Sequence, residues 1–164
     1  MKGFETFSAH NKGRHDGEGR KCGIVGSCPD GKFARVTSKG ENVLRMAEVP
    51  EGEREDYQID TLTLLGGSKA FIDEETREFA LLQLDELSKI HQAEWFLLVD
   101  HFDCSKWKLA LKKSLMNDRQ FHYNKLREAY AIIKDRLPHL QVILAYASPV
   151  DGDMVQFEHV TPTG

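Results

Sequence analysis

Hydrophobic residues along the chain gather in short runs that alternate with longer amphipathic stretches. The short runs end at glycine, proline or charged residues, as buried strands do, and the longer stretches repeat with a helical period. This pattern predicts strands at 21–28, 57–67, 94–104, 140–148 and 154–160. It predicts helices at 73–92, 105–116 and 118–136.

The helix predicted at 73–92 has the clearest amphipathic pattern. Its acidic residues at 73–75 suit the positive end of the helix dipole. Its expected apolar stripe, which would face the core, consists of Phe79, Leu82, Leu84, Leu87 and Ile90. The stretch 33–57 is polar and mixed, with a short helix at 40–49 and an acidic loop at 50–56.

Strands that alternate with helices indicate an α/β fold with a mostly parallel sheet and helices on both of its faces. The turn sequence PVDGD makes the last strand antiparallel and places it at an edge. Ligands bind such sheets at the carboxyl ends of the strands, where the strand order reverses. If the first and third strands are neighbours, and the second lies on the other side of the first, their carboxyl ends face one crevice.

Length and charge narrow the possible classes of protein. Residues 1–20 have no periodicity and are predicted to form a polar arm, which leaves 21–164 as a single domain. The 22 basic and 26 acidic residues give a net charge of −4, which offers no basis for binding nucleic acid or an anionic membrane. There is no apolar run of the roughly 20 residues that cross a bilayer. No secretory signal is recognisable, and three cysteines is an odd number, so we expect a cytoplasmic protein with reduced thiols.

Candidate ligands for a metal follow two of the predicted strands. Cys28 and Asp30 come directly after the first strand, and His101 and Cys104 end the third. Two thiolates and one imidazole suit zinc and leave its fourth position open for water. Asp30 would either fill that position or accept a proton from the water. A cysteine at a strand end is more often a packing residue than a ligand, but the coincidence of the two strand ends favours the metal.

The remaining cysteine and histidines receive no role in this site. Cys22 lies roughly 20 Å from Cys28 along an extended strand, so it is expected to be a core cysteine. His91 and His122 are expected to lie on helix surfaces. Asp100, beside His101, has no assigned role.

The two motifs resemble those of the β-class carbonic anhydrases. That family has Cys-x-Asp-x-Arg after its first core strand and His-x-x-Cys after its third, and here the stretches read CPDGK at 28–32 and HFDC at 101–104. A looser similarity extends from about residue 21 to the C-terminus and includes the glycine-containing stretch DTLTLLGGSKAF at 60–71. The resemblance implies the strand order two-one-three-four with an antiparallel fifth strand, and a homodimer.

The resemblance also implies a zinc lyase that hydrates carbon dioxide to bicarbonate through a zinc-bound hydroxide. Zinc would be bound by Cys28, His101 and Cys104. Asp30 would orient the hydroxide, and Lys32, which replaces the family's arginine, would orient Asp30 as a point charge rather than through a bidentate fork. Gly66 and Gly67 would either present backbone amides to the substrate or form an ordinary turn at a strand end.

Three other functions remain open at this point. The same zinc could hydrolyse a related small molecule such as carbonyl sulfide or carbon disulfide. The chain could be a non-catalytic zinc-binding domain. It could also be a thiol redox protein that uses Cys28 and Cys104 without metal.

Overall fold

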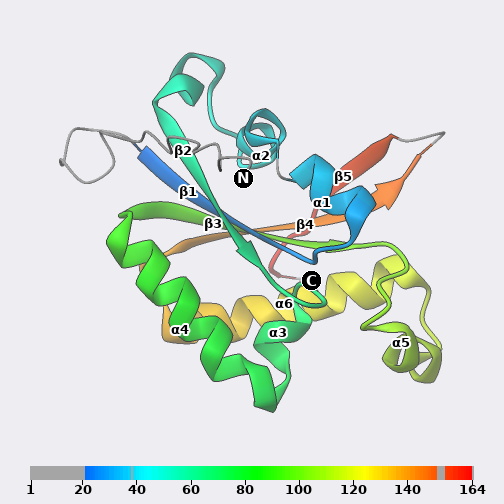
Figure 1. Ribbon diagram of the computed structural model, residues 1–164. Helices are drawn as coiled ribbons and strands as arrows, with labels where there is room; N and C mark the ends of the chain where they lie inside the picture. Colours follow the sequence, from blue (N-terminus) through cyan, green and yellow to red (C-terminus); the bar gives the residue numbers. More distant parts are fainter. Residues whose placement is uncertain (1–20, 38, 151–153, 164) are drawn as a thin grey trace, which may run out of the picture.

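The computed structural model describes residues 21–37, 39–150 and 154–163 and contains one five-stranded sheet. The arm predicted at 1–20 lies outside these residues. Four strands run parallel in the order β2-β1-β3-β4, and β5 is antiparallel at the edge beside β4 (Figure 1). This confirms the predicted α/β fold and its strand order. The strands are β1 (Lys21–Ser27), β2 (Tyr57–Thr63), β3 (Ala93–His101), β4 (Gln141–Pro149) and β5 (Val155–His159).

Helices cover both faces of the sheet, as predicted. Helices α3, α4 and α6 lie on one face, whereas α1 and α2 lie on the other (Figure 1). None of the helices within the described ranges combines the length and the hydrophobicity needed to cross a membrane. The helices are α1 (Gly31–Thr37), α2 (Gly40–Met46), η1 (Glu51–Asp56), α3 (Lys69–Ile72), α4 (Glu74–Ile90), α5 (Lys108–Ser114) and α6 (Asp118–Arg136).

The central strand β3 is buried along almost its whole length because both of its faces are covered. Its side chains alternate between two cores. Phe96 and Leu98 pack with α3, α4 and α6, and Leu97 and Val99 pack with α1 and α2. The same alternation places Asp100 on the face covered by α3, α4 and α6, and His101 on the face covered by α1 and α2.

Two strands end three or four residues earlier than predicted. β2 ends at Thr63, and the chain then turns at Gly66 and Gly67, whose positive φ angles of 81° and 58° a strand does not allow. β3 ends at His101, and Asp103 follows with a φ of 53°. The chain therefore turns before Cys104 rather than after it.

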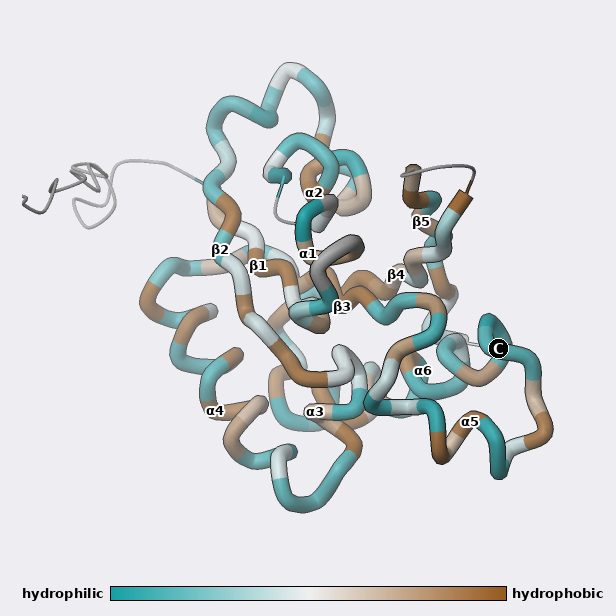
Figure 2. The backbone as a smooth tube through the Cα atoms, turned by 45° about the vertical axis from the view of Figure 1, so that its right-hand side comes forward, coloured by the Kyte–Doolittle hydropathy of each residue, from teal (hydrophilic) through white to brown (hydrophobic). Residues whose placement is uncertain are grey.

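The buried face of α4 differs from the predicted stripe. The buried residues are Ala80, Leu81, Leu84 and Ser88. Phe79, Leu82 and Ile90 are instead 66%, 54% and 63% exposed, so the prediction was wrong for them. Each residue turns the helix by about 100°, which places these three on the side away from the sheet. Figure 2 accordingly shows hydrophobic positions along α4 as well as in the strands.

Candidate metal centre

Three potential metal ligands meet at the carboxyl edge of the sheet. Cys28 follows β1, His101 is the last residue of β3, and Cys104 lies in the turn after β3. The two sulfur atoms and a ring nitrogen of His101 all lie within 4.8 Å of one another, and all three side chains are buried. Bonds of about 2.0–2.3 Å to a tetrahedral zinc separate ligand atoms by roughly 3.5–3.8 Å, which falls within this limit.

The turn after β3 places His101 and Cys104 on the same side of the chain. Phe102 N–H donates to the carbonyl oxygen of Ala147 on β4 at 2.8 Å, which holds the chain to the sheet for one more residue. Asp103 then takes a left-handed conformation, in which aspartate is more common than most residues. Trp107 N–H donates to the carbonyl oxygen of Cys104 at 2.9 Å and closes the turn.

The imidazole of His101 is oriented by its surroundings. Nδ1 lies 2.9 Å from the carbonyl oxygen of Phe102, which can only accept, so Nδ1 carries the proton. The ring of Phe33 stacks on the imidazole with centroids 4.5 Å apart. Nε2 is buried and has no hydrogen-bond partner among the residues that the structure describes. A buried nitrogen with a free lone pair is what a metal ligand requires.

The two thiols differ in acidity because they contact each other. Hydrogen bonding with Cys104 lowers the pKa of Cys28 to about 4, despite the opposing effect of burial, and His101 and the Gly66 N–H at 3.4 Å contribute to the lowering. The same contact, together with burial, raises the pKa of Cys104. Burial opposes the charged form of His101, but interactions with Cys28 and with the Phe102 carbonyl outweigh it and raise its pKa. The cluster therefore holds a thiolate, a thiol and an imidazole, and a bound cation would take the place of the protons that they share.

This donor set fits zinc. Two sulfur atoms and one imidazole nitrogen are the ligand types that zinc prefers, and the unpartnered Nε2 supplies the third ligand atom.

The glycine pair lies beside the cluster, but its amides have partners within the chain. Gly66 N–H donates to Cys28 Sγ, and Gly67 N–H donates to the carbonyl oxygen of Leu64 at 3.0 Å. Trp107 Nε1–H donates to the carbonyl oxygen of Gly66 at 3.1 Å, which fixes the turn against α5. Binding of substrate by this pair stays a prediction.

A buried carboxylate, which received no role from the sequence, holds that glycine turn. Asp100 is 1% exposed and accepts hydrogen bonds from Ser68 N–H at 2.7 Å and from Ser68 Oγ–H at 2.6 Å. His122 Nδ1 lies 2.9 Å from its Oδ2. A Cβ atom on Gly67 would come within 2.3 Å of its Oδ1, so only glycine fits there.

His122 is fully buried, and the expectation that it lies on a helix surface was therefore wrong. Its ring packs against Trp107, Phe121 and Tyr146. The available signal was a charged residue, Asp100, inside the apolar run of β3. Such a residue requires a buried polar partner.

The structure describes the Asp30 side chain of the predicted Asp30–Lys32 pair but not that of Lys32. Asp30 is exposed at the start of α1, where its carbonyl oxygen accepts from Ala34 N–H at 2.7 Å. Its charge makes a small contribution to the raised pKa of His101, which places it near the cluster. The side chain of Lys32 lies outside the described residues, so the pairing stays a prediction.

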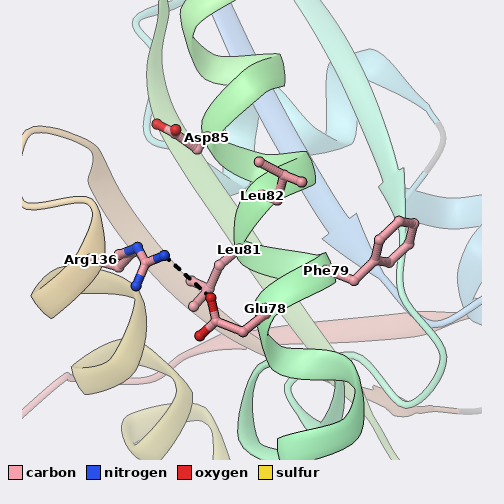
Figure 3. A pocket seen from close by; sticks show the side chains of 6 residues that line it. All are labelled: Glu78, Phe79, Leu81, Leu82, Asp85 and Arg136. Atoms are coloured by element: carbon pink, nitrogen blue, oxygen red, sulfur yellow. Dashed lines mark hydrogen bonds and ion pairs between the residues drawn. The ribbon is translucent and has the colours of Figure 1, made fainter.

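A separate surface groove lies on α4, away from the cluster. It is lined by Phe79, Leu81 and Leu82 and by the ion pair of Glu78 with Arg136 at 3.2 Å (Figure 3). Neither the cluster nor the glycine turn contributes to it.

Comparison with known proteins supports the fold. No protein-family model and no curated protein matches the sequence. Among solved structures, the chain is similar to the crystal structure of the β-carbonic anhydrase of the fungal pathogen Aspergillus fumigatus, with a TM-score of 0.51 and 10% sequence identity. The match covers 89% of this chain and 78% of that one. At this identity the similarity establishes a shared fold and not membership of the family.

Proposed function

We propose that this chain hydrates carbon dioxide to bicarbonate with a zinc ion bound by Cys28, His101 and Cys104. The observation that carries the proposal is the convergence of these three donors at the carboxyl edge of β1 and β3. The fold shared with a carbonic anhydrase supports it. Zinc with three protein ligands acts as a Lewis acid and lowers the pKa of a coordinated water to about 7.

Apolar side chains surround the proposed ligands and suit a small apolar substrate. Trp107 and Phe121 pack against the two cysteines, and Phe33 packs on His101. Such an environment excludes bulk water and strengthens the electrostatic interactions of the site. Asp30 would accept a hydrogen bond from the attacking water and orient it, and Lys32 would hold the Asp30 carboxylate.

The proposal is tested by stopped-flow measurement of carbon dioxide hydration on the zinc-loaded chain between about pH 6 and pH 9, a range that brackets a pKa of about 7. Wild type should accelerate hydration, and Cys28→Ser and His101→Ala should not. Asp103→Asn is the matched control because its exposed side chain lies between the ligands in sequence. A fully zinc-loaded wild type with only the background rate would overturn the proposal.

The roles of Asp30 and Lys32 have a separate test. Lys32→Ala should lower the rate about tenfold or more without loss of zinc, because general acid–base groups contribute about 10²–10⁴ to rates. Lys32→Arg should keep or raise the rate, since a guanidinium fork holds a carboxylate in two contacts. Asp30→Asn should be slow as well. Equal rates in all three variants and wild type would exclude this role for Asp30.

The other functions give distinct outcomes in the same experiments. A hydrolase would turn over carbonyl sulfide or carbon disulfide with the same ligand requirement. A non-catalytic zinc domain would hold zinc without turnover. A redox protein would bind no zinc and would form a reversible disulfide between Cys28 and Cys104.

We also propose a homodimer in the cytoplasm. The exposed Phe79, Leu82 and Ile90 on α4 offer apolar surface for a second copy. None of the three cysteines, all within the described residues, forms a disulfide bond, which suits a reducing compartment.

A further inference from the structure

A second cluster of metal-binding residue types lies at the opposite edge of the sheet. Cys22 is the second residue of β1, Asp60 lies in β2, and His91 follows the last residue of α4. The Cys22 sulfur, a carboxylate oxygen of Asp60 and a ring nitrogen of His91 all lie within 4.8 Å of one another. Cys22 is six residues before Cys28, roughly 20 Å away along the strand, so this cluster is separate from the proposed zinc site.

The thiol and the imidazole converge on one oxygen atom. Cys22 Sγ–H donates to Asp60 Oδ2 at 3.3 Å, and His91 Nδ1 contacts the same Oδ2. Gln58 Nε2–H donates to the other oxygen, Oδ1, at 3.4 Å. The three potential ligand atoms are therefore already close neighbours, with Asp60 Oδ2 in contact with the other two.

The fold brings these residues together from three elements. The residues paired across β1 and β2 include Cys22 with Gln58 and Ile24 with Asp60, so Cys22 and Asp60 lie diagonally on neighbouring strands. Helix α4 covers the same face and ends beside them. His91 N–H donates to the carbonyl oxygen of Leu87 at 3.2 Å, which fixes the end of the helix.

The cluster is largely removed from solvent. Cys22 is 3% exposed, and Asp60 and His91 have side-chain exposures of 10% and 17%. A carboxylate this far buried requires hydrogen-bond donors or a compensating positive charge. A divalent cation would supply that charge and would also compensate a Cys22 thiolate.

We propose that Cys22, Asp60 and His91 bind a second divalent transition metal ion, of which zinc is the expected one. A thiolate and an imidazole select zinc over magnesium or calcium, and a carboxylate completes a three-ligand set. Binding releases the Cys22 thiol proton to solvent, His91 binds as a neutral imidazole that keeps one proton on the ring nitrogen facing away from the ion, and no group changes its oxidation state. The partly exposed side of His91 leaves room for a water as the fourth ligand.

The role of this ion is structural. It joins β1, β2 and α4 through residues that are 38 and 31 positions apart in the chain. A ligand that binds only the folded state stabilises it by mass action. The inference does not depend on carbon dioxide hydration or on the ligands at the carboxyl edge.

The test is metal analysis of the full chain after dialysis against zinc, with Co²⁺ substitution as a second readout. Wild type should hold two ions, and Cys22→Ser and His91→Ala should each hold one. Cys28→Ser should also retain one ion, bound by Cys22, Asp60 and His91 at the amino edge of the sheet, where the parallel strands begin. Charge-transfer absorption from thiolate to Co²⁺ should fall by about one third in Cys22→Ser, because one of three cobalt–sulfur bonds is lost.

Controls separate the loss of a ligand from general damage to the fold. His139→Ala removes an exposed histidine outside the cluster and should hold two ions. A second measurement needs no variant of the cluster itself. In a Cys28→Ser, Cys104→Ser chain the only thiol is Cys22, and zinc should slow its alkylation at least tenfold.

The proposal is wrong if Cys22→Ser and His91→Ala keep every ion that wild type holds. It is also wrong if alkylation of Cys22 is equally fast with and without zinc. Failure of the proposed function would give a different result. A wild type without hydration activity could still lose one ion on Cys22→Ser and still show slower alkylation of Cys22 with zinc.

Discussion

The two ends of β1 each carry a cysteine, and the two thiols have opposite hydrogen-bonding roles. Cys28, at the carboxyl end, accepts from the Gly66 amide and lies against a second thiol and an imidazole, which together lower its pKa to about 4. Cys22, at the amino end, donates to the carboxylate of Asp60. One end of the strand therefore stabilises a thiolate, whereas at the other end the Cys22 sulfur serves as a hydrogen-bond donor.

The difference follows from the elements that meet at each end. Turns after β1, β2 and β3 meet at the carboxyl edge and bring backbone N–H groups toward the sulfur. At the amino edge the neighbour is the C-terminal end of α4, which places the His91 ring beside the Asp60 carboxylate. Parallel sheets thus offer different chemistry at their two edges, even to the same type of residue.

The largest expected effect separates the two edges directly. Cys104→Ser should lower zinc affinity at the carboxyl edge more than about 100-fold, because loss of a ligand exceeds the roughly 10–100-fold effect of losing a residue that only hydrogen-bonds to a ligand. It should leave the ion at the amino edge in place. Equilibrium dialysis with a competing chelator measures both affinities. Loss of both ions in this variant would contradict the independence of the two edges.

The second prediction compares the buried carboxylates of the two edges. On metal-free protein, Asp100→Ala should cost about 3–5 kcal/mol of unfolding free energy, since it leaves Ser68 and His122 buried without their partner. Asp60→Ala should cost less, about 1–3 kcal/mol, because water can reach His91. Urea denaturation followed by circular dichroism measures both.

The control for this comparison is Asp103→Asn, which removes a carboxylate that is 62% exposed, keeps a residue type suited to the φ of 53°, and should change stability by less than about 0.5 kcal/mol. Equal losses of unfolding free energy in Asp60→Ala and Asp100→Ala would contradict the expected difference between the two carboxylates.

The third prediction concerns the turn that exists only at the carboxyl edge. Gly67→Ala should cost about 2 kcal/mol, because alanine is disfavoured at a φ of 58° and its Cβ would displace the Asp100 carboxylate. Zinc affinity should fall about tenfold, since the displaced turn carries the Gly66 amide. Gly52→Ala, where no atom lies within 4 Å of the added Cβ, is the matched control. Unchanged zinc affinity in Gly67→Ala would exclude a role of the turn in binding the metal.

The smallest expected effect on stability concerns the outer face of α4, which belongs to neither edge. Phe79→Ser combined with Leu82→Ser should change the unfolding free energy of the monomer by less than about 0.5 kcal/mol per site, because both side chains are exposed. The same change should convert a homodimer to a monomer in sedimentation velocity at micromolar concentration. A wild type that sediments as one chain would remove this face as a dimer interface.

The sequence determined the order of elements and the sheet they form. Runs such as WFLLVD in β3 carry apolar side chains on both faces of the strand. A parallel sheet covered by amphipathic helices on both sides buries both sets of side chains. The three predicted ligands could also be named from the sequence, because each lies at or just after the carboxyl end of a strand. Adjacent parallel strands bring their carboxyl ends to the same edge of the sheet, whatever the packing of the helices and loops.

Only the tertiary structure decided which side chains meet across elements distant in sequence. The contact of Asp100 with Ser68 and His122 depends on the side of α6 that faces β3, and that of Cys22 with Asp60 and His91 depends on strand register and on where α4 ends. The exposure of Phe79 and Ile90 likewise depends on which side of α4 packs on the sheet. A local pattern specifies the period of a helix or strand, but packing against the other elements sets its rotation, register and final turn.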